Sequence, residues 1–191
     1  MNLGSVAALR SKKVLLACAV GLGCVLLGPA ALAKVFYAKD EALKLAFPEA
    51  DRIEMLTFIL TEVQLKKAEQ MARVRIESKL FTFYIGKKNS EILGYAAIDS
   101  HIVRTLPETF MVVLTPEGRV RTTLVLAFYE PLEYAPAERW LGQFRDQKLS
   151  PDLWVGREIA GIAGSTLTAQ AIIQGVRKVL ALFQILIKET K

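Results

Sequence analysis

The stretch LTAQAIIQGVRKVLALFQILIK, residues 167–188, decides the fold that we expect for this chain. Its apolar residues recur every three or four positions, which predicts an amphipathic helix. From Val179 to Ile187 the segment is apolar almost all round. That pattern favours a deeply buried helix, and the alternative is extra apolar surface for a membrane partner. The predicted stripe consists of Ile172, Val176, Val179, Leu180, Phe183 and Ile187.

The residues that open this helix are Ala163-Gly164-Ser165-Thr166-Leu167-Thr168. They combine a glycine, other small residues and three hydroxyls. The first backbone N–H groups of a helix have no partner within the helix, and the helix dipole favours an anion there. The segment therefore predicts a phosphate site. The simpler alternative is structural, with Ser165 as N-cap and Gly164 in a tight turn.

The rest of the chain predicts shorter elements around the long helix. Thr61 and Gln64 match a capping box, and the helix that they begin should place Val63, Met71 and Val74 toward the core. Residues 115–118 (TPEG) suit a type I turn. Expected helices cover 38–47, 61–73 and 137–144, the last with Trp140, Leu141 and Phe144 buried, and expected strands cover 53–60, 80–85, 92–98, 109–114 and 120–129.

This order of elements predicts an α+β fold: a mainly antiparallel sheet of two hairpins, covered by helices, with a long C-terminal amphipathic helix. Residues 34–191 are long enough for a single domain with a core of its own. Tyr84, Tyr129 and Trp140 are expected in that core.

Residues 1–33 are predicted to be a signal peptide or an N-terminal membrane anchor. Basic residues at 10, 12 and 13 precede an apolar run, Val14 to Leu27, and Ala31-Leu32-Ala33 resembles a cleavage site before Lys34. Lipidation at Cys18 or Cys24 is a weaker alternative. Either main interpretation places the domain in the periplasm or another extracytoplasmic space, with possible membrane association through the N-terminus.

Composition excludes several classes of chemistry. Both cysteines lie within residues 1–33, so the remainder has no disulfide, thiolate-bound metal or c-type haem. His101 is the only histidine, and we expect it on the surface or in a loop. Residues 1–33 hold three basic residues and no acidic one, so without them the charge falls from +6 to +3. That charge is too small and too evenly spread to predict binding to nucleic acid.

Residues 162–172 (IAGSTLTAQAI) and 175–179 (GVRKV) resemble the C-terminal motif of the FMN-binding domain family. This family includes the flavin-carrying C and G subunits of the sodium-pumping NADH:quinone oxidoreductase and of the Rnf complex, and the exported domain of nitrous-oxide-reductase regulators. The likeness covers about residues 50–185. Gly94-Tyr95, residues 116–120 (PEGRV) and residues 130–134 (EPLEY) support it.

The resemblance implies FMN as cofactor, linked through its phosphate to Thr166. Gly164 matches the motif glycine and Thr168 the trailing hydroxyl, which is also a weaker acceptor candidate. Ala163, Ser165 and Leu167 complete the implied binding segment, and Glu130 and Tyr134 occupy the second shared loop. Three positions depart from the pattern. Ala163 and Ser165 stand where Ser or Thr and Ala are usual, and Ala160 replaces the Asp that a flavin transferase recognises, with Glu158 nearby but out of register.

The function thus expected is an exported electron-transfer flavoprotein, more a carrier than an independent enzyme. Its partners would be a flavin transferase and a membrane-bound or periplasmic redox protein. The alternatives are a flavin-free binding or structural module of this fold, a flavin-dependent reductase with its own acceptor, and a site for another anion. Asp99, His101 and Arg104 are a possible polar cluster, and Trp154 is a candidate contact for the flavin ring.

Overall fold

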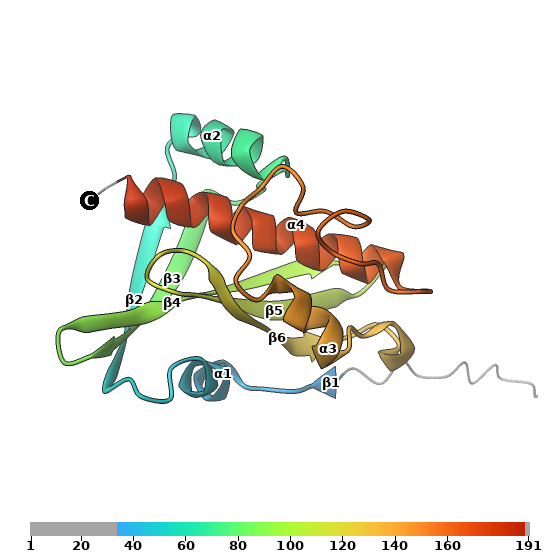
Figure 1. Cartoon of the computed structure of the whole chain (residues 1–191), viewed down its shortest axis with the longest axis horizontal. Coiled ribbons are helices and arrows are strands. Elements are labelled where there is room, and N and C mark those ends of the chain that lie inside the picture. Colours follow the sequence, from blue (N-terminus) through green and yellow to red (C-terminus); the bar gives the residue numbers. More distant parts are fainter. Residues whose placement is uncertain (1–33, 190–191) are drawn as a thin grey trace, which may run out of the picture. The chain divides into compact units, whose positions relative to one another are not determined.

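The computed structural model describes residues 34–189, which form an antiparallel six-stranded sheet with helices on both faces (Figure 1). The expected signal peptide or anchor lies outside these residues. The strand order is β1-β6-β5-β4-β3-β2. The strands are β1 (Lys34–Val35), β2 (Arg52–Ile59), β3 (Leu80–Lys88), β4 (Glu91–Ile102), β5 (Pro107–Leu114) and β6 (Val120–Phe128).

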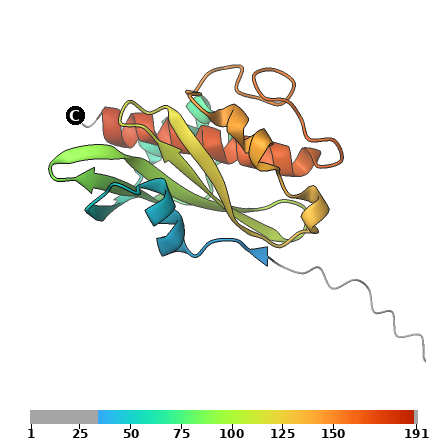
Figure 2. The same cartoon turned by 60° about the horizontal axis from the view of Figure 1, so that its bottom comes forward.

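The sheet divides the core into two parts, each covered by one or more helices. Helix α1 (Lys39–Ala46) packs on one face of the sheet, and α2 (Glu62–Ala72), α3 (Glu138–Leu141) and α4 (Thr166–Phe183) pack on the other (Figure 2). The larger cluster includes Phe83, Phe110 and Ile172, and the smaller one includes Leu43 and Met111. The predicted α+β fold is confirmed, with β1 as an edge strand that the sequence did not predict.

Both predicted hairpins are present. The β5–β6 turn closes through a hydrogen bond from the Gly118 N–H to the Thr115 carbonyl at 2.9 Å. Gly118 has a φ of 84°, and a Cβ on it would lie 2.4 Å from the Phe183 ring. A residue with a side chain would thus strain the turn and disturb its contact with the long helix.

Both strands of the β3–β4 hairpin are longer than predicted. They pair with each other only near the turn, between Tyr84–Lys88 and Glu91–Ala96, and farther from the turn they separate. Strand β4 continues along β5 to Ile102, so His101 lies within a strand and is half-buried, and not on the surface or in a loop as expected. The pairing with β5 decides this, because the residues from Asp99 to His101 have no strong strand propensity of their own.

The long helix is confirmed, and all six residues of its predicted stripe are buried. A π-helical turn, Gln184–Lys188, completes it. By length and composition the segment Thr166–Lys188 is apolar enough to cross a membrane, but 72% of its most apolar window is buried within the fold. This burial favours the interpretation as a core helix.

Helix α2 has the predicted capping box: the Gln64 N–H donates to Thr61 Oγ1, and the Thr61 N–H donates to Gln64 Oε1. The prediction that Val63 faces the core is wrong, because Val63 is 76% exposed. The helix buries Ala68 and Ala72 instead, and Val63 lies five residues, or about 140° of helical rotation, from Ala68.

Candidate functional site

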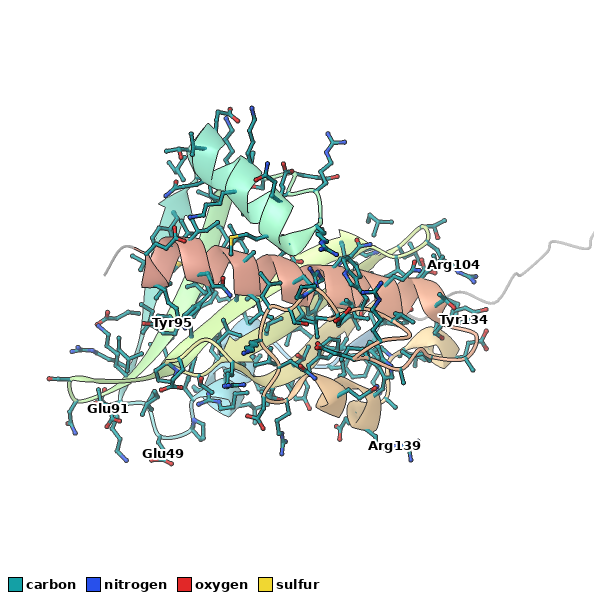
Figure 3. The ribbon with its side chains drawn as sticks, turned by 45° about the horizontal axis from the view of Figure 1, so that its top comes forward. Glu49, Glu91, Tyr95, Arg104, Tyr134 and Arg139 are labelled. Carbon is teal, nitrogen blue, oxygen red and sulfur yellow. The ribbon has the colours of Figure 1, made fainter. Side chains whose placement is uncertain are left out.

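A small cavity lies at one end of the sheet, where the start of α4 meets the β4–β5 turn and the segment after β6. Its volume is about 140 Å³. Figure 3 shows Arg104 and Tyr134 at this end, far from Glu91 at the β3–β4 turn. The cavity is lined by Val103, Arg104, Glu130, Tyr134, Gly164, Ser165, Thr166, Leu167 and Thr168. These lining residues include every predicted binding residue except Ala163.

The first turn of α4 presents open hydrogen-bond donors to this cavity. Ser165 occupies the N-cap position and its N–H donates to the Ile162 carbonyl across a turn that contains Gly164, as the structural alternative predicted, but the Ser165 side chain makes no capping hydrogen bond. The first intrahelical bond near this end runs from the Ala169 N–H to the Ser165 carbonyl. Among residues 34–189, no hydrogen bond is found for the N–H groups of Thr166, Leu167 and Thr168. Such a turn suits an anion.

The hydroxyls of this segment differ in accessibility. Ser165 and Thr168 are 4% and 1% exposed, whereas Thr166 is exposed. Of the three residues, Thr166 therefore carries the hydroxyl that a second macromolecule can reach. Gly164, just before them in the chain, has a φ of 77°, a left-handed conformation that favours glycine.

Arg104 and Tyr134 form the side of the cavity that faces α4. The Arg104 guanidinium lies 4.7 Å from the centre of the Tyr134 ring, a cation–π contact. Tyr134 belongs to a 3-10 turn, Leu132–Tyr134, that follows β6. Arg104 places a permanent positive charge beside the open donors, which strengthens the site for an anion.

Glu130 shapes the turn that carries Arg104. Its Oε1 accepts hydrogen bonds from the N–H groups of Arg104, Thr105 and Leu106, at 3.2, 2.8 and 2.9 Å. These bonds, led by that from Thr105, lower the pKa of Glu130 below its ordinary value. Glu130 thus stays ionised and fixes the turn, and the positive charge of Arg104 offsets part of its charge.

The loop before α4 is held by two side chains outside the cavity. Trp140 Nε1 donates to the Ala160 carbonyl at 2.7 Å, and the Ala160 N–H donates to Gln143 Oε1 at 2.8 Å. Trp154 lies over the guanidinium of Arg177 at 4.4 Å and does not line the cavity. The structure therefore gives Trp154 a packing role and does not support the hypothesis that it contacts a flavin ring.

Asp99, His101 and Arg104 do not form one polar cluster, because each binds a different partner. Asp99 forms an ion pair with Lys178, and His101 Nε2 lies 3.3 Å from Oε2 of Glu108. Glu108 is fully buried, and its Oε1 has no partner among the described residues. Burial raises the pKa of Glu108. The sequence analysis missed Glu108, although an acidic residue at an inward position of an apolar strand is a usable signal.

A second, larger hollow of about 1,040 Å³ lies where β3 and β4 part. Asp99, His101, Tyr84 and Tyr129 line it, and both tyrosines are half-buried. Tyr84 also packs against the smaller core cluster, whereas Tyr129 belongs to neither cluster. None of the predicted FMN-binding residues lies there. Within residues 34–189, no group of three potential metal-binding side chains is found.

A comparison of the chain with models of known protein families and with curated protein sequences found no match. The functional argument therefore depends on the geometry of the cavity and on the motif resemblance.

Proposed function

We propose that this protein is an extracytoplasmic electron carrier that holds one FMN through a phosphoester on Thr166. The observation that carries the proposal is the position of Thr166: an exposed hydroxyl at an uncapped helix start, beside a cavity that also contains Arg104. A phosphodiester keeps one negative charge, which the open N–H groups and the guanidinium stabilise.

The size of the cavity supports the phosphate end of the cofactor, and not the whole cofactor, as its proposed occupant. Pockets that enclose a whole drug-sized ligand measure roughly 300–1,000 Å³, whereas this one measures about 140 Å³. The isoalloxazine ring would then lie at the exposed rim, beside Leu167 and Tyr134. A bound flavin supplies the redox chemistry, and the chain supplies attachment and orientation.

Attachment requires an activated donor, for which we propose a flavin adenine dinucleotide used by a separate transferase. The Thr166 Oγ1 attacks the phosphorus next to the riboflavin, a new P–O bond forms, and the diphosphate bond breaks. AMP leaves with the electron pair of that bond, and the hydroxyl proton is released. No electron is transferred in this step, so no oxidant or reductant is needed.

The test is the intact mass of the full chain co-expressed with a flavin transferase, beside two matched variants. We expect the mass to increase by one FMN less one water in the natural chain and in Thr168→Val, and not in Thr166→Val. Thr168 is buried and Thr166 is exposed, so the pair separates the two acceptor candidates. Addition that persists in Thr166→Val but not in Thr168→Val would contradict the assignment.

The flavin-free module remains the second candidate, and the residue at position 160 favours it. Ala160 is exposed, so an Asp there would fit sterically, yet the chain lacks the carboxylate that the family's transferase recognises. We expect Ala160→Asp to increase the modified fraction if recognition limits loading. A natural chain and an Ala160→Asp variant that both stay unmodified and colourless beside an active transferase would favour the flavin-free module.

A further inference from the structure

The end of the sheet that carries the cavity also carries the first described residue, Lys34. Lys34 pairs with Phe128, and Phe128 pairs with Glu108 near the start of β5. The turn between β4 and β5 contains Arg104, which lines the cavity. Figure 1 shows β1 and the start of α4 at the same end of the sheet.

The sequence before Lys34 limits how far this end can lie from an inserted apolar segment. Only six residues, 28–33, separate the apolar run Val14–Leu27 from Lys34. At roughly 3.3–3.6 Å per extended residue they span about 22 Å at most. If the run stays in a bilayer as an anchor, Lys34 must lie close to the lipid headgroups.

The surface chemistry of this end fits a lipid interface. Leu167, which lines the cavity, is 45% exposed, and Ile102 and Leu132, which are close in the chain to the lining residues Val103 and Tyr134, are 61% and 46% exposed. Lys34 and Arg104 are exposed and basic, and Glu133 is an exposed acidic residue in the same region. Exposed apolar side chains combined with Lys, Arg and a tyrosine such as Tyr134 are typical of surfaces that lie against the headgroup layer.

We propose that this end of the domain rests on the bilayer that holds residues 14–27. The contact surface consists of Lys34, Ile102, Arg104, Leu132 and Leu167, called the site end below. The rim of the cavity then opens at the membrane surface, and a redox partner would reach it from within or along the membrane. The orientation itself requires neither FMN nor Thr166, so it can fail or hold independently of the proposed function.

The experiment uses the full chain in vesicles of phosphatidylcholine and phosphatidylglycerol, with and without nitroxide-labelled lipid. Cys18→Ser and Cys24→Ser remove the natural thiols, and a fluorescent label is then attached to single cysteines. Ile102→Cys and Leu167→Cys report on the site end. Ile59→Cys is the matched apolar control, since Ile59 is 79% exposed on β2, the opposite edge strand from β1. Glu91→Cys reports on the β3–β4 turn.

We expect several-fold stronger quenching by the nitroxide lipid at positions 102 and 167 than at positions 59 and 91. Adding Leu132→Ser to the labelled Leu167→Cys chain should weaken the quenching, and circular dichroism checks that the variant is folded. Equal quenching at all four positions, or stronger quenching at position 59, would overturn the proposal. A vesicle-bound fraction whose intact mass lacks residues 1–33 would overturn it as well.

Discussion

The middle of α4 and its first turn belong to the same helix but differ in how their polar groups are satisfied. In the middle, Arg177 is fully buried and donates to the carbonyls of Ala72, Ser150 and Leu153. In the first turn, the N–H groups of Thr166 to Thr168 have no partner among residues 34–189. The contacts of Arg177 thus hold the centre of the helix in place, while the N–H groups of its first turn stay open.

Arg177→Met should have the largest effect, because it removes the link between α2, the preceding loop and α4. The carbonyls that Arg177 satisfies would be left buried without donors, which costs about 3 kcal/mol or more of unfolding free energy. Urea denaturation measures this loss. Arg139→Met is the matched control, since Arg139 is exposed on α3 and we expect little change there. A shift of similar size in both variants would contradict the central role of Arg177.

Replacing a glycine with alanine, which adds one methyl group, compares the middle of α4 at Gly175 with the residues just before its first turn at Gly164. In Gly175→Ala the new Cβ would lie 2.2 Å from the Phe110 ring and 2.8 Å from Asp99 Oδ2, so overpacking should cost about 1–3 kcal/mol. In Gly164→Ala no atom lies within 4 Å, but the positive φ should cost about 1 kcal/mol. Urea denaturation should therefore rank Gly175→Ala as the more destabilised variant. Intact mass after co-expression should show the greater loss of FMN loading in Gly164→Ala, and the opposite ranking would refute the comparison.

Glu130→Gln tests the wall of the cavity and its pH dependence. The variant keeps an oxygen acceptor for the three N–H groups but loses the charge, which should cost about 1 kcal/mol at neutral pH. The pKa of Glu130 is lowered in the folded state, so its contribution is present above the ordinary value of 4.5 and is lost as pH falls through the folded-state pKa. Thermal unfolding from neutral to acidic pH should show a smaller acid-induced loss in the variant, and parallel curves would argue against the role of Glu130.

Glu108→Gln should change the stability least, and at neutral pH it should stabilise the protein, whereas the other variants destabilise it. Burial raises the pKa of Glu108, so its folded-state contribution is complete below 4.5 and is lost as pH rises through the raised value. Gln carries no charge, and the variant should be slightly more stable than the natural chain at neutral pH and lack this decline. Urea denaturation at acidic and neutral pH compares the two. If the variant is less stable at neutral pH, the His101 contact stabilises Glu108 more than burial penalises it.

Local patterns predicted much of the fold but only part of the site. Periodicity identified α4, and turn and cap residues identified both hairpins and the start of α2. The motif resemblance supplied Glu130 and Tyr134, which the structure places at the cavity. The roles of Arg177 and Glu108 were not predicted. Arg177 donates to Ala72, 105 residues away along the chain, and no local pattern encodes such a contact.

Residue patterns were enough to predict the α+β class, the order of the elements from α1 to α4 without β1, and an open polar helix start at α4. Helices, hairpins and caps depend mainly on interactions between near neighbours in the chain. Contacts between distant parts of the chain, in contrast, determine that Arg104, Glu130 and Tyr134 meet that helix start, that Thr166 is exposed while Thr168 is buried, and that β3 and β4 separate. These features depend on strand register and on helix-to-sheet packing, which are set by contacts between residues far apart in the sequence.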